Sequence, residues 1–314
     1  MEAIPENPLL EFLPDSLETI RKVYNLENGR MVQSVNILEE WVKKQSHFVN
    51  KNISRVSLEK TIVACKGSVE KAKKQIDNLC TFKTLMPKYF TDTGIKEIVL
   101  KINDLAFALP LPKMTKEYER IYFVRFDTIG KEIKSADFLD YYRYTIFVAE
   151  YLKEHDYPNG FIVIEDFRRI NITDILTKIN FTEFQEYMSI LTEGFGARMK
   201  GIHVITHSKA IDLLVNFIKS MLSPKLASRV HVHTNPESIH EIIDKSLLPL
   251  EYGGDLGSMT SIQEKWMDVL CSKENKKYLA EMKASCTNES FRQKDKFNEQ
   301  YMGLPGSFRT FTVD

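Results

Sequence analysis

The chain has 314 residues, of which 43% are hydrophobic and 27% charged, so it can bury a sizeable core as a globular protein. Its 43 Lys and Arg residues equal its 43 Asp and Glu residues in number. This balance excludes a global field that would concentrate nucleic acid, and any attraction to an anionic membrane must come from a local patch.

Residues 1–92 carry the pattern of a small helical bundle. The segment DSLETIRKVY begins with an Asp-Ser cap, and VNILEEWVKKQ places Val35, Leu38 and Val42 on one face. A third segment, SVEKAKKQIDNL, has an N-terminal serine cap and a glutamate in its first turn. We therefore predict an all-α N-terminal domain.

After Arg120 the pattern changes to short β-rich runs separated by longer helical ones. RIYFVRF, GFIVIED, KGIHVIT and RVHVHT predict strands, and the segments between them, including 135–155 and 209–222, predict helices. The alternation predicts an α/β sheet with crossover helices over residues 93–257, and the continuous apolar strands predict that both faces are covered. A polar helical tail is expected over residues 258–314.

Neither a signal peptide nor a spanning helix is expected. The first residues, MEAIPENPLLEFLPDSLE, are acidic and broken by prolines, and no apolar run approaches the roughly 18 residues that a membrane span needs. The four cysteines are far apart and form no CxxC pair, which is typical of reduced thiols. We therefore expect a soluble, cytoplasmic protein without a cofactor.

Two motifs that suggest chemistry are explained better by structure. GFGARMKG contains Gly194 and Gly196, but it follows a helix and precedes a strand, the reverse of the order in a dinucleotide-binding turn. His203 and His207 are four residues apart and His231 and His233 two apart, and on strands each pair would point to one face. No acid or cysteine joins them at short spacing, so we favour a structural role over a metal site.

The strand NGFIVIED carries an acid on its apolar face. Phe161, Val163 and Glu165 alternate onto one side, so a carboxylate points toward an interior where it would need a partner. The alternative is that Glu165 lies at the strand end and reaches water in the next loop. The residues alone do not separate these two interpretations.

The helix over residues 209–222, KAIDLLVNFIKSML, is apolar over more than half of its circumference. An ordinary surface helix has one apolar stripe. This helix is therefore either deeply buried, or it covers a ligand and can meet a membrane.

The order and spacing of these segments resemble the CRAL-TRIO family of intracellular lipid-binding and transfer proteins. KGIHVIT, NFIKSMLSPKLASRVHVH and LLPLEYGG follow the family's order, VACKGSVEKAKKQIDNL is similar to its N-terminal bundle, and NGFIVIED is similar to a strand of its retinaldehyde-binding member. The likeness covers nearly the whole chain and is greatest to the tocopherol and retinaldehyde carriers. The resemblance implies that LLPLEYGG closes the lipid-binding domain. Pro249 would end the preceding segment, and Tyr252 would pack against the end of the core. Gly253 and Gly254 would allow backbone angles that larger residues cannot adopt.

The resemblance implies a sheet beneath a hydrophobic pocket that is roofed by a mobile helix, here residues 209–222. It implies a non-enzymatic carrier of a retinoid, carotenoid or tocopherol between membranes, and phospholipid or phosphoinositide exchange or presentation is the alternative. An enzyme acting on a lipid is a third class, but no nucleophile, base and orienting group stand in a recognisable arrangement. Some side chains are expected to line the pocket and bind the ligand, because the periodicity of their helix or strand points them inward or because they match pocket positions of the family. They are Tyr144, Phe147, Phe161, Val163, Tyr187, Leu191, Phe195, Ile202, Ile211, Ile218 and Leu222.

The resemblance also implies a phosphoinositide-binding cluster beside the lid, formed by Arg198, Lys200, Lys225 and Arg229. Cations there can bind phosphates through charge-assisted hydrogen bonds. The family's N-terminal helix usually adds arginines, where this chain has Val63 and Cys65 with only Lys66 nearby. The expected partners are one small hydrophobic ligand and, transiently, an anionic membrane surface.

A charge pair is expected inside the pocket. If helix 135–155 faces the pocket through Tyr144 and Phe147, Arg143 lies one turn before Phe147 and can approach Glu165. Because desolvating two charges tends to cancel their attraction, the pair would orient a polar end of the ligand. A structural salt bridge at the rim is the alternative.

Overall fold

The computed structural model describes residues 4–27 and 29–292, and its N-terminal part is helical, as the sequence predicts. Ser54 and Ser68 cap two of the helices by accepting hydrogen bonds from main-chain N–H groups in the first turn. Leu38, Leu58 and Ile62 are fully buried at the centre of this helical region. The helices are α1 (Ser16–Val23), α2 (Arg30–Lys44), α3 (Arg55–Ala64), α4 (Val69–Leu85) and α5 (Ile95–Leu105).

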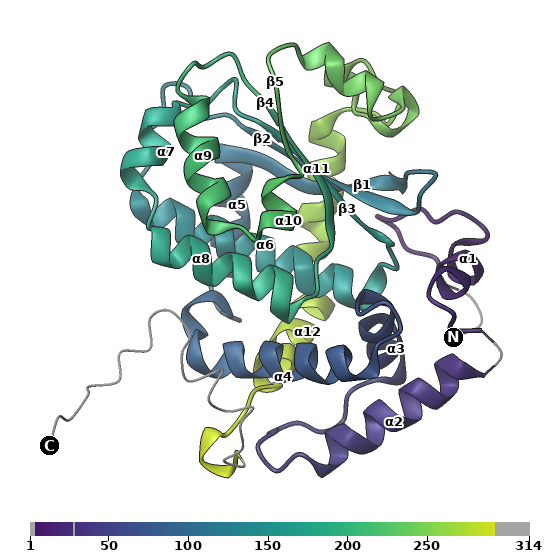
Figure 1. The fold of residues 1–314 in the computed structure, drawn as a ribbon. Helices are drawn as coiled ribbons and strands as arrows, with labels where there is room; N and C mark the ends of the chain where they lie inside the picture. Colours follow the sequence, from purple (N-terminus) through teal and green to yellow (C-terminus); the bar gives the residue numbers. More distant parts are fainter. Residues whose placement is uncertain (1–3, 28, 293–314) are drawn as a thin grey trace, which may run out of the picture.

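A five-stranded sheet forms the centre of the molecule and confirms the predicted α/β class (Figure 1). The strands lie in chain order, with the first pair antiparallel and every later pair parallel. They are β1 (Ala106–Met114), β2 (Glu119–Phe126), β3 (Gly160–Asp166), β4 (Met199–Ile205) and β5 (Val230–His233). The sequence analysis assigned no element to residues 93–119, where the structure has α5 and β1. Pro110 and Pro112 obscure the strand pattern, and β1 tolerates them because it is an edge strand.

The crossover helices all lie on one side of this sheet (Figure 1). The strands β2 to β5 are added in one direction across the sheet, and crossovers between parallel strands are right-handed, so every connection lies on the same face. These connections are α6 (Ser135–His155), α7 (Ile172–Lys178), α8 (Phe181–Ser189), α9 (Ile211–Met221) and α10 (Pro224–Ala227). A single π-helical turn, Ile190–Gly194, continues α8.

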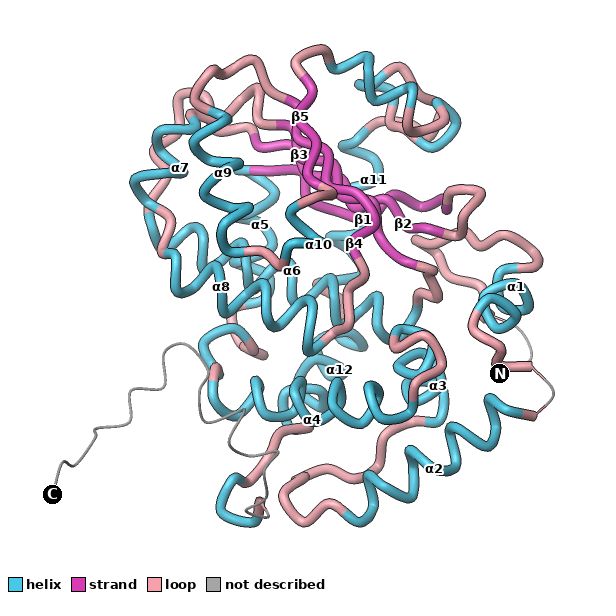
Figure 2. Tube along the Cα trace, in the orientation of Figure 1, coloured by secondary structure: helices cyan, strands magenta, loops and turns pink. Residues whose placement is uncertain are grey.

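The segment that the sequence analysis described as a polar tail packs beside the edge strand β1. Its helices are α11 (Met259–Leu270), which packs on β1 and α5, and α12 (Lys273–Ala284), which packs on α6 and lies near α4, away from the sheet (Figure 2). Trp266 of α11 is almost completely buried, and its ring N–H donates to the carbonyl of Pro110 at 3.2 Å. This helix therefore completes the core against β1.

The LLPLEYGG motif packs against the face of the sheet opposite the crossover helices. Leu248 is fully buried, and the ring of Tyr252 lies 4.5 Å from that of Phe123 on β2. Gly253 has a φ of 69°, and a Cβ on Gly254 would lie 2.0 Å from the carbonyl oxygen of Leu248. The glycine pair therefore allows a backbone turn and a close approach that larger residues would prevent.

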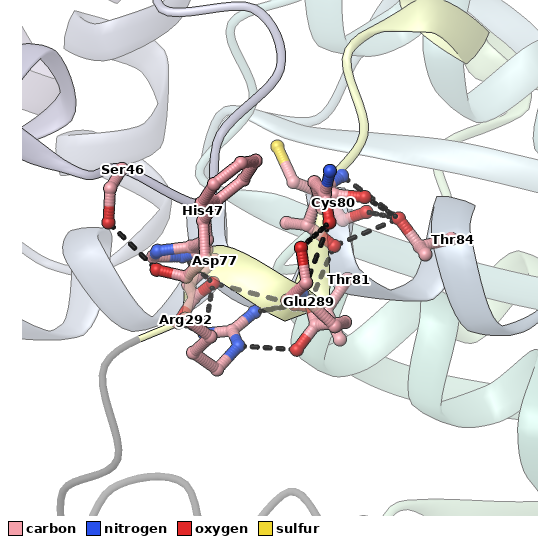
Figure 3. Close-up of polar contacts among 12 residues, drawn as sticks. Ser46, His47, Asp77, Cys80, Thr81, Thr84, Glu289 and Arg292 are labelled. Atoms are coloured by element: carbon pink, nitrogen blue, oxygen red, sulfur yellow. Dashed lines mark hydrogen bonds and ion pairs between the residues drawn. The ribbon is translucent and has the colours of Figure 1, made fainter.

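The chain after α12 returns to the N-terminal helices and is tied to α4 by a buried polar network (Figure 3). Both guanidinium-to-carboxylate contacts from Arg292 to Asp77 are shorter than 3 Å, and His47 contacts the same carboxylate at 2.9 Å. Burial alone would raise the pKa of Asp77, but the hydrogen bonds from His47 and the Arg292 guanidinium hold it below its ordinary value. Thr287 and Thr84 add a hydroxyl contact at 2.9 Å.

Candidate functional site

A cavity of about 290 Å³ lies between the crossover face of the sheet and helices α6, α8 and α9. Alternate residues of each strand face it, because side chains along a strand point to opposite sides in turn. Tyr122 and Val124 of β2, Val163 of β3 and Val204 of β4 belong to this wall. The other residues of these strands pack into the core beneath α11.

Nine of the predicted pocket residues line the cavity. Three are on β3, four are on or near α8 and α9, and the others come from the end of the π-helical turn and from β4. That they contact a ligand remains a prediction. They are Phe161, Val163, Glu165, Tyr187, Leu191, Phe195, Ile202, Ile218 and Leu222.

Tyr144 and Phe147 lie outside the cavity wall, contrary to the prediction. Both are almost completely buried on the side of α6 that packs with α5 and α11. The cavity instead receives Tyr141, Thr145 and Ala149 of the same helix. Because α6 has protein on both sides, its apolar pattern extends around most of the helix, and periodicity alone did not identify the face toward the cavity.

Ile211 is also outside the wall. It is buried at the first turn of α9 in a core cluster with Phe167, Ile172 and Val230. The prediction placed it one turn too early, since Leu214, Val215 and the later residues of this face reach the cavity.

The predicted pair between Arg143 and Glu165 is wrong. Arg143 contacts Asp140 at 3.0 Å and donates to the carbonyl of Lys88 at 2.7 Å. It shares the helix side of Phe147, which points away from the cavity.

Glu165 makes no hydrogen bond or ion pair with any described residue. It lies in the cavity wall, and its burial there favours the interpretation in which it points toward the interior. Tyr122, Tyr141 and Tyr187 are near enough for the Glu165 charge to raise their pKa values, in addition to the larger effect of burial. Burial raises the pKa of Glu165 to about 7, so both its neutral and its ionised forms are present at physiological pH.

The four predicted cations lie near the same end of the domain, and the structure adds two lysines from the N-terminal helices. Lys225 is exposed and is the main cause that holds the pKa of Lys66 below its ordinary value, followed by burial and by Arg198, Lys200 and Lys71. Lysines 66 and 71 therefore belong to one cationic surface with the predicted residues. We call Lys66, Lys71, Arg198, Lys200, Lys225 and Arg229 the basic cluster.

Three members of the basic cluster also make structural contacts. Arg198 donates to the Tyr24 hydroxyl at 2.6 Å and lines the inner end of the cavity. Lys200 lies 3.4 Å from Glu119, and Arg229 donates to the carbonyl of Met199. A substitution at these three positions would change packing as well as charge.

Three of the strand histidines are in contact. The facing ring nitrogens of His203 and His233 are 3.0 Å apart, and His231 stacks on His203 with ring centroids 5.3 Å apart. Burial, followed by the two neighbouring rings, lowers the pKa of His203 to about 4. In the described ranges no group of three or more His, Cys, Asp or Glu side chains is arranged to hold a metal ion.

Helix α9 has one face in the cavity wall and one in the open. Leu214, Val215 and Ile218 line the cavity, whereas Leu213 is 67% exposed. The ring of Phe217 lies 4.2 Å from that of Phe181 on α8. Over the described residues, every helix is too short or too polar to cross a bilayer.

The sequence analysis did not single out two lysines of the cavity wall, Lys60 on α3 and Lys153 on α6. Lys153 is four residues after Ala149 and eight after Thr145, so helical spacing places it on their face. That spacing could have identified it once the cavity face of α6 was known.

An α/β domain with a mostly apolar cavity on the crossover side of its sheet is the class that the fold and site define. Residues 107–254 match the family model of the CRAL/TRIO domain, and residues 27–98 match that of the Pinta-like UBA domain. Residues 107–254 are therefore similar to the CRAL/TRIO domain, as the sequence resemblance indicated.

Individual proteins are similar over shorter stretches. Alpha-tocopherol transfer protein-like of Homo sapiens is 28% identical over 125 residues, which are 39% of this chain and 35% of the relative. Clavesin-1 of Rattus norvegicus is 31% identical over 99 residues, which are 31% of this chain and 28% of the relative. The matched stretches thus span about a third of the length of these relatives. The crystal structure of Sfh5 covers 80% of this chain and 92% of its own, with 11% identity and a TM-score of 0.45.

Proposed function

We propose that this protein is a non-enzymatic carrier that encloses one small hydrophobic molecule of retinoid, carotenoid or tocopherol type and transfers it between membranes. The observation that carries the proposal is the cavity of about 290 Å³ with predominantly apolar walls. Its volume lies at the lower end of the range of pockets that bury small ligands. Burying an apolar molecule there is favourable by about 25 cal/mol for each Å² removed from water.

The alternative is exchange or presentation of a phospholipid or phosphoinositide. The basic cluster favours contact with phosphate headgroups, because several of its cations lie within electrostatic reach of one another on one surface. The cavity volume favours a smaller, single-chain occupant over a lipid with two acyl chains. We therefore place the phosphoinositide at the basic cluster, on the membrane side, and the cargo inside the cavity.

Helix α9 is the proposed lid. It supplies part of the cavity wall and exposes Leu213 on its outer side, so movement away from the sheet would open the cavity and offer an apolar face to a bilayer. The exposed cation of Lys225 on α10 follows this helix directly and would orient it toward anionic headgroups.

Glu165 is proposed to hydrogen-bond a hydroxyl or carbonyl of the cargo. It has no protein partner among the described residues, and near neutral pH it can act as a donor in its protonated form and as an acceptor when ionised. The polar group of the cargo would replace the water that a carboxyl group otherwise requires.

A vesicle transfer assay tests the function. A fluorescent tocopherol analogue and a fluorescent phosphatidylcholine are each loaded into donor vesicles, and acceptor vesicles are supplied with or without phosphoinositide. The proposal predicts faster transfer of the tocopherol analogue, with further acceleration by phosphoinositide. Preferential transfer of phosphatidylcholine would support the alternative instead.

A further inference from the structure

The end of the cavity beneath the N-terminal helices contains two lysine side chains. Lys60 of α3 and Lys153 of α6 both belong to the cavity wall. The ammonium group of Lys60 donates to the carbonyl of Glu154, whereas Lys153 makes no hydrogen bond or ion pair with any described residue. Burial is the main cause that lowers the pKa of Lys153, and it lowers that of Lys60 to about 8. Lys60 therefore remains largely charged at neutral pH.

The nearby carboxylates are mostly paired with other cations. Glu150 lies 2.8 Å from Lys83, and both side chains are almost completely buried. Asp156 contacts Arg120 at 2.9 Å, again with both side chains buried.

The two remaining acids near this end do not neutralise it. Glu59 pairs with Arg21 at 2.5 Å. Glu154 accepts a hydrogen bond from Ser57 at 3.2 Å and is the remaining anion beside Lys60. Among the described residues, Glu154 is thus the one nearby carboxylate that is not paired with another cation. The guanidinium of Arg198, which also lines the cavity, is hydrogen-bonded to the Tyr24 hydroxyl and the Pro158 carbonyl and not to an acid.

A buried charge without a partner is unfavourable, so it is retained where it meets a ligand or is otherwise compensated. The cationic end is far from Glu165. Thr145 shares the neighbourhood of Tyr141 and Tyr187, near Glu165, and Lys153 lies eight residues further along α6. Eight helical residues span about 12 Å, and the wall between includes Ala149, Leu152 and Leu191. The cavity thus has a cationic end and an apolar middle.

We propose that the Lys60 and Lys153 end of the cavity binds the carboxylate of a single-chain, long-chain acid whose hydrocarbon chain extends along the apolar wall toward Glu165. This rests on the proposed carrier function, narrows its cargo to an acid, and leaves Glu165 to a hydroxyl or carbonyl group near the far end of the chain. A carboxylate has two acceptor oxygens, one for each of the two lysine side chains. A cavity of about 290 Å³ favours one chain.

The test compares cis-parinaric acid, a fluorescent long-chain fatty acid, with its methyl ester on the delipidated full chain. Because a hydrogen bond to a charged group contributes more than a neutral one, the wild type is expected to bind the acid about tenfold or more tightly than the ester. Lys153→Met keeps an unbranched side chain without the charge, so it should bring the acid to the affinity of the ester and leave ester binding unchanged. Lys43→Met, at an exposed lysine of α2 that pairs with Glu39, is the matched control and should keep the preference for the acid.

Each contrary result has a distinct meaning. Equal binding of acid and ester to the wild type overturns the acid proposal and leaves the carrier function standing. Tighter binding of a long-chain alkyl phosphate than of the acid overturns the choice of carboxylate. Binding of neither parinaric probe overturns the acid proposal, and an absence of vesicle transfer as well would remove the carrier function.

Thermal unfolding separates a ligand role from a structural one. If Lys153 is kept for a ligand, Lys153→Met should raise the melting temperature of the delipidated protein, because it removes a buried polar group that has no hydrogen-bond partner among the described residues. A lower melting temperature together with an unchanged acid preference would show that Lys153 is structural and would overturn its assignment.

Discussion

The unpartnered carboxyl group of Glu165 predicts that Glu165→Gln stabilises the delipidated protein in a pH-dependent manner. Burial raises the pKa of Glu165 to about 7 in the folded protein, whereas its ordinary value is 4.5. Below about pH 4.5 the carboxyl group is neutral in both the folded and the unfolded state, so its titration takes nothing from the free energy of unfolding. As the pH rises to about 7, the unfolded state ionises first and the folded protein loses stability.

The difference between these pKa values corresponds to about 3 kcal/mol, and above about pH 7 it stays constant. Glu165→Gln cannot ionise, so it should unfold with the same free energy as the wild type near pH 4 and with up to about 3 kcal/mol more near pH 8. Urea unfolding of both proteins at several pH values measures this difference. Glu132→Gln, at an exposed glutamate, is the control and should show no such trend. A constant difference across the pH range, or a Gln variant that is less stable near pH 8, would refute the reasoning.

Three further predictions follow from the site. Val163→Trp should fill the cavity and abolish retention of a fluorescent lipid. Phe147→Ala should leave retention intact and lower the free energy of unfolding by about 3–5 kcal/mol. The reverse pattern would place the ligand on the other side of α6. Lys225→Ala should reduce phosphoinositide-stimulated transfer at low salt and have little effect at high salt, where the Debye length falls below ~8 Å. The control Lys277→Ala, at an exposed lysine of α12, should transfer normally. A loss that does not depend on salt would argue against electrostatic attraction. Arg143→Gln should leave ligand affinity unchanged and lower the free energy of unfolding by at most about 1 kcal/mol, because the contact between Arg143 and Asp140 is partly exposed. A selective loss of ligand affinity would be inconsistent with a position of Arg143 outside the cavity wall.

Most of the sheet could be predicted from sequence because its parallel strands are buried on both faces and appear as continuous apolar runs. The alternation in NGFIVIED also identified Phe161, Val163 and Glu165 as one face, and the structure places all three in the cavity wall. The edge strand β1 could not be found in this way, because two prolines interrupt its pattern.

The helices were harder to orient than the strands. Helix α6 contacts the cavity on one side and α5 with α11 on the other, so apolar residues occur around it and the pattern does not favour either face. That ambiguity produced the wrong positions of Tyr144, Phe147 and Arg143. Lys60 and Lys153 were missed because they are far apart in sequence and meet only when α3 packs on the end of α6.

The most direct measurement is to extract the purified protein with organic solvent and to identify and quantify by mass spectrometry what is released. The account predicts close to one single-chain lipid per protein molecule, and a reduced amount from the Val163→Trp variant purified in the same way. Extracts without lipid, or a two-chain phospholipid that is bound equally by wild type and variant, would contradict a cavity that carries one small hydrophobic molecule.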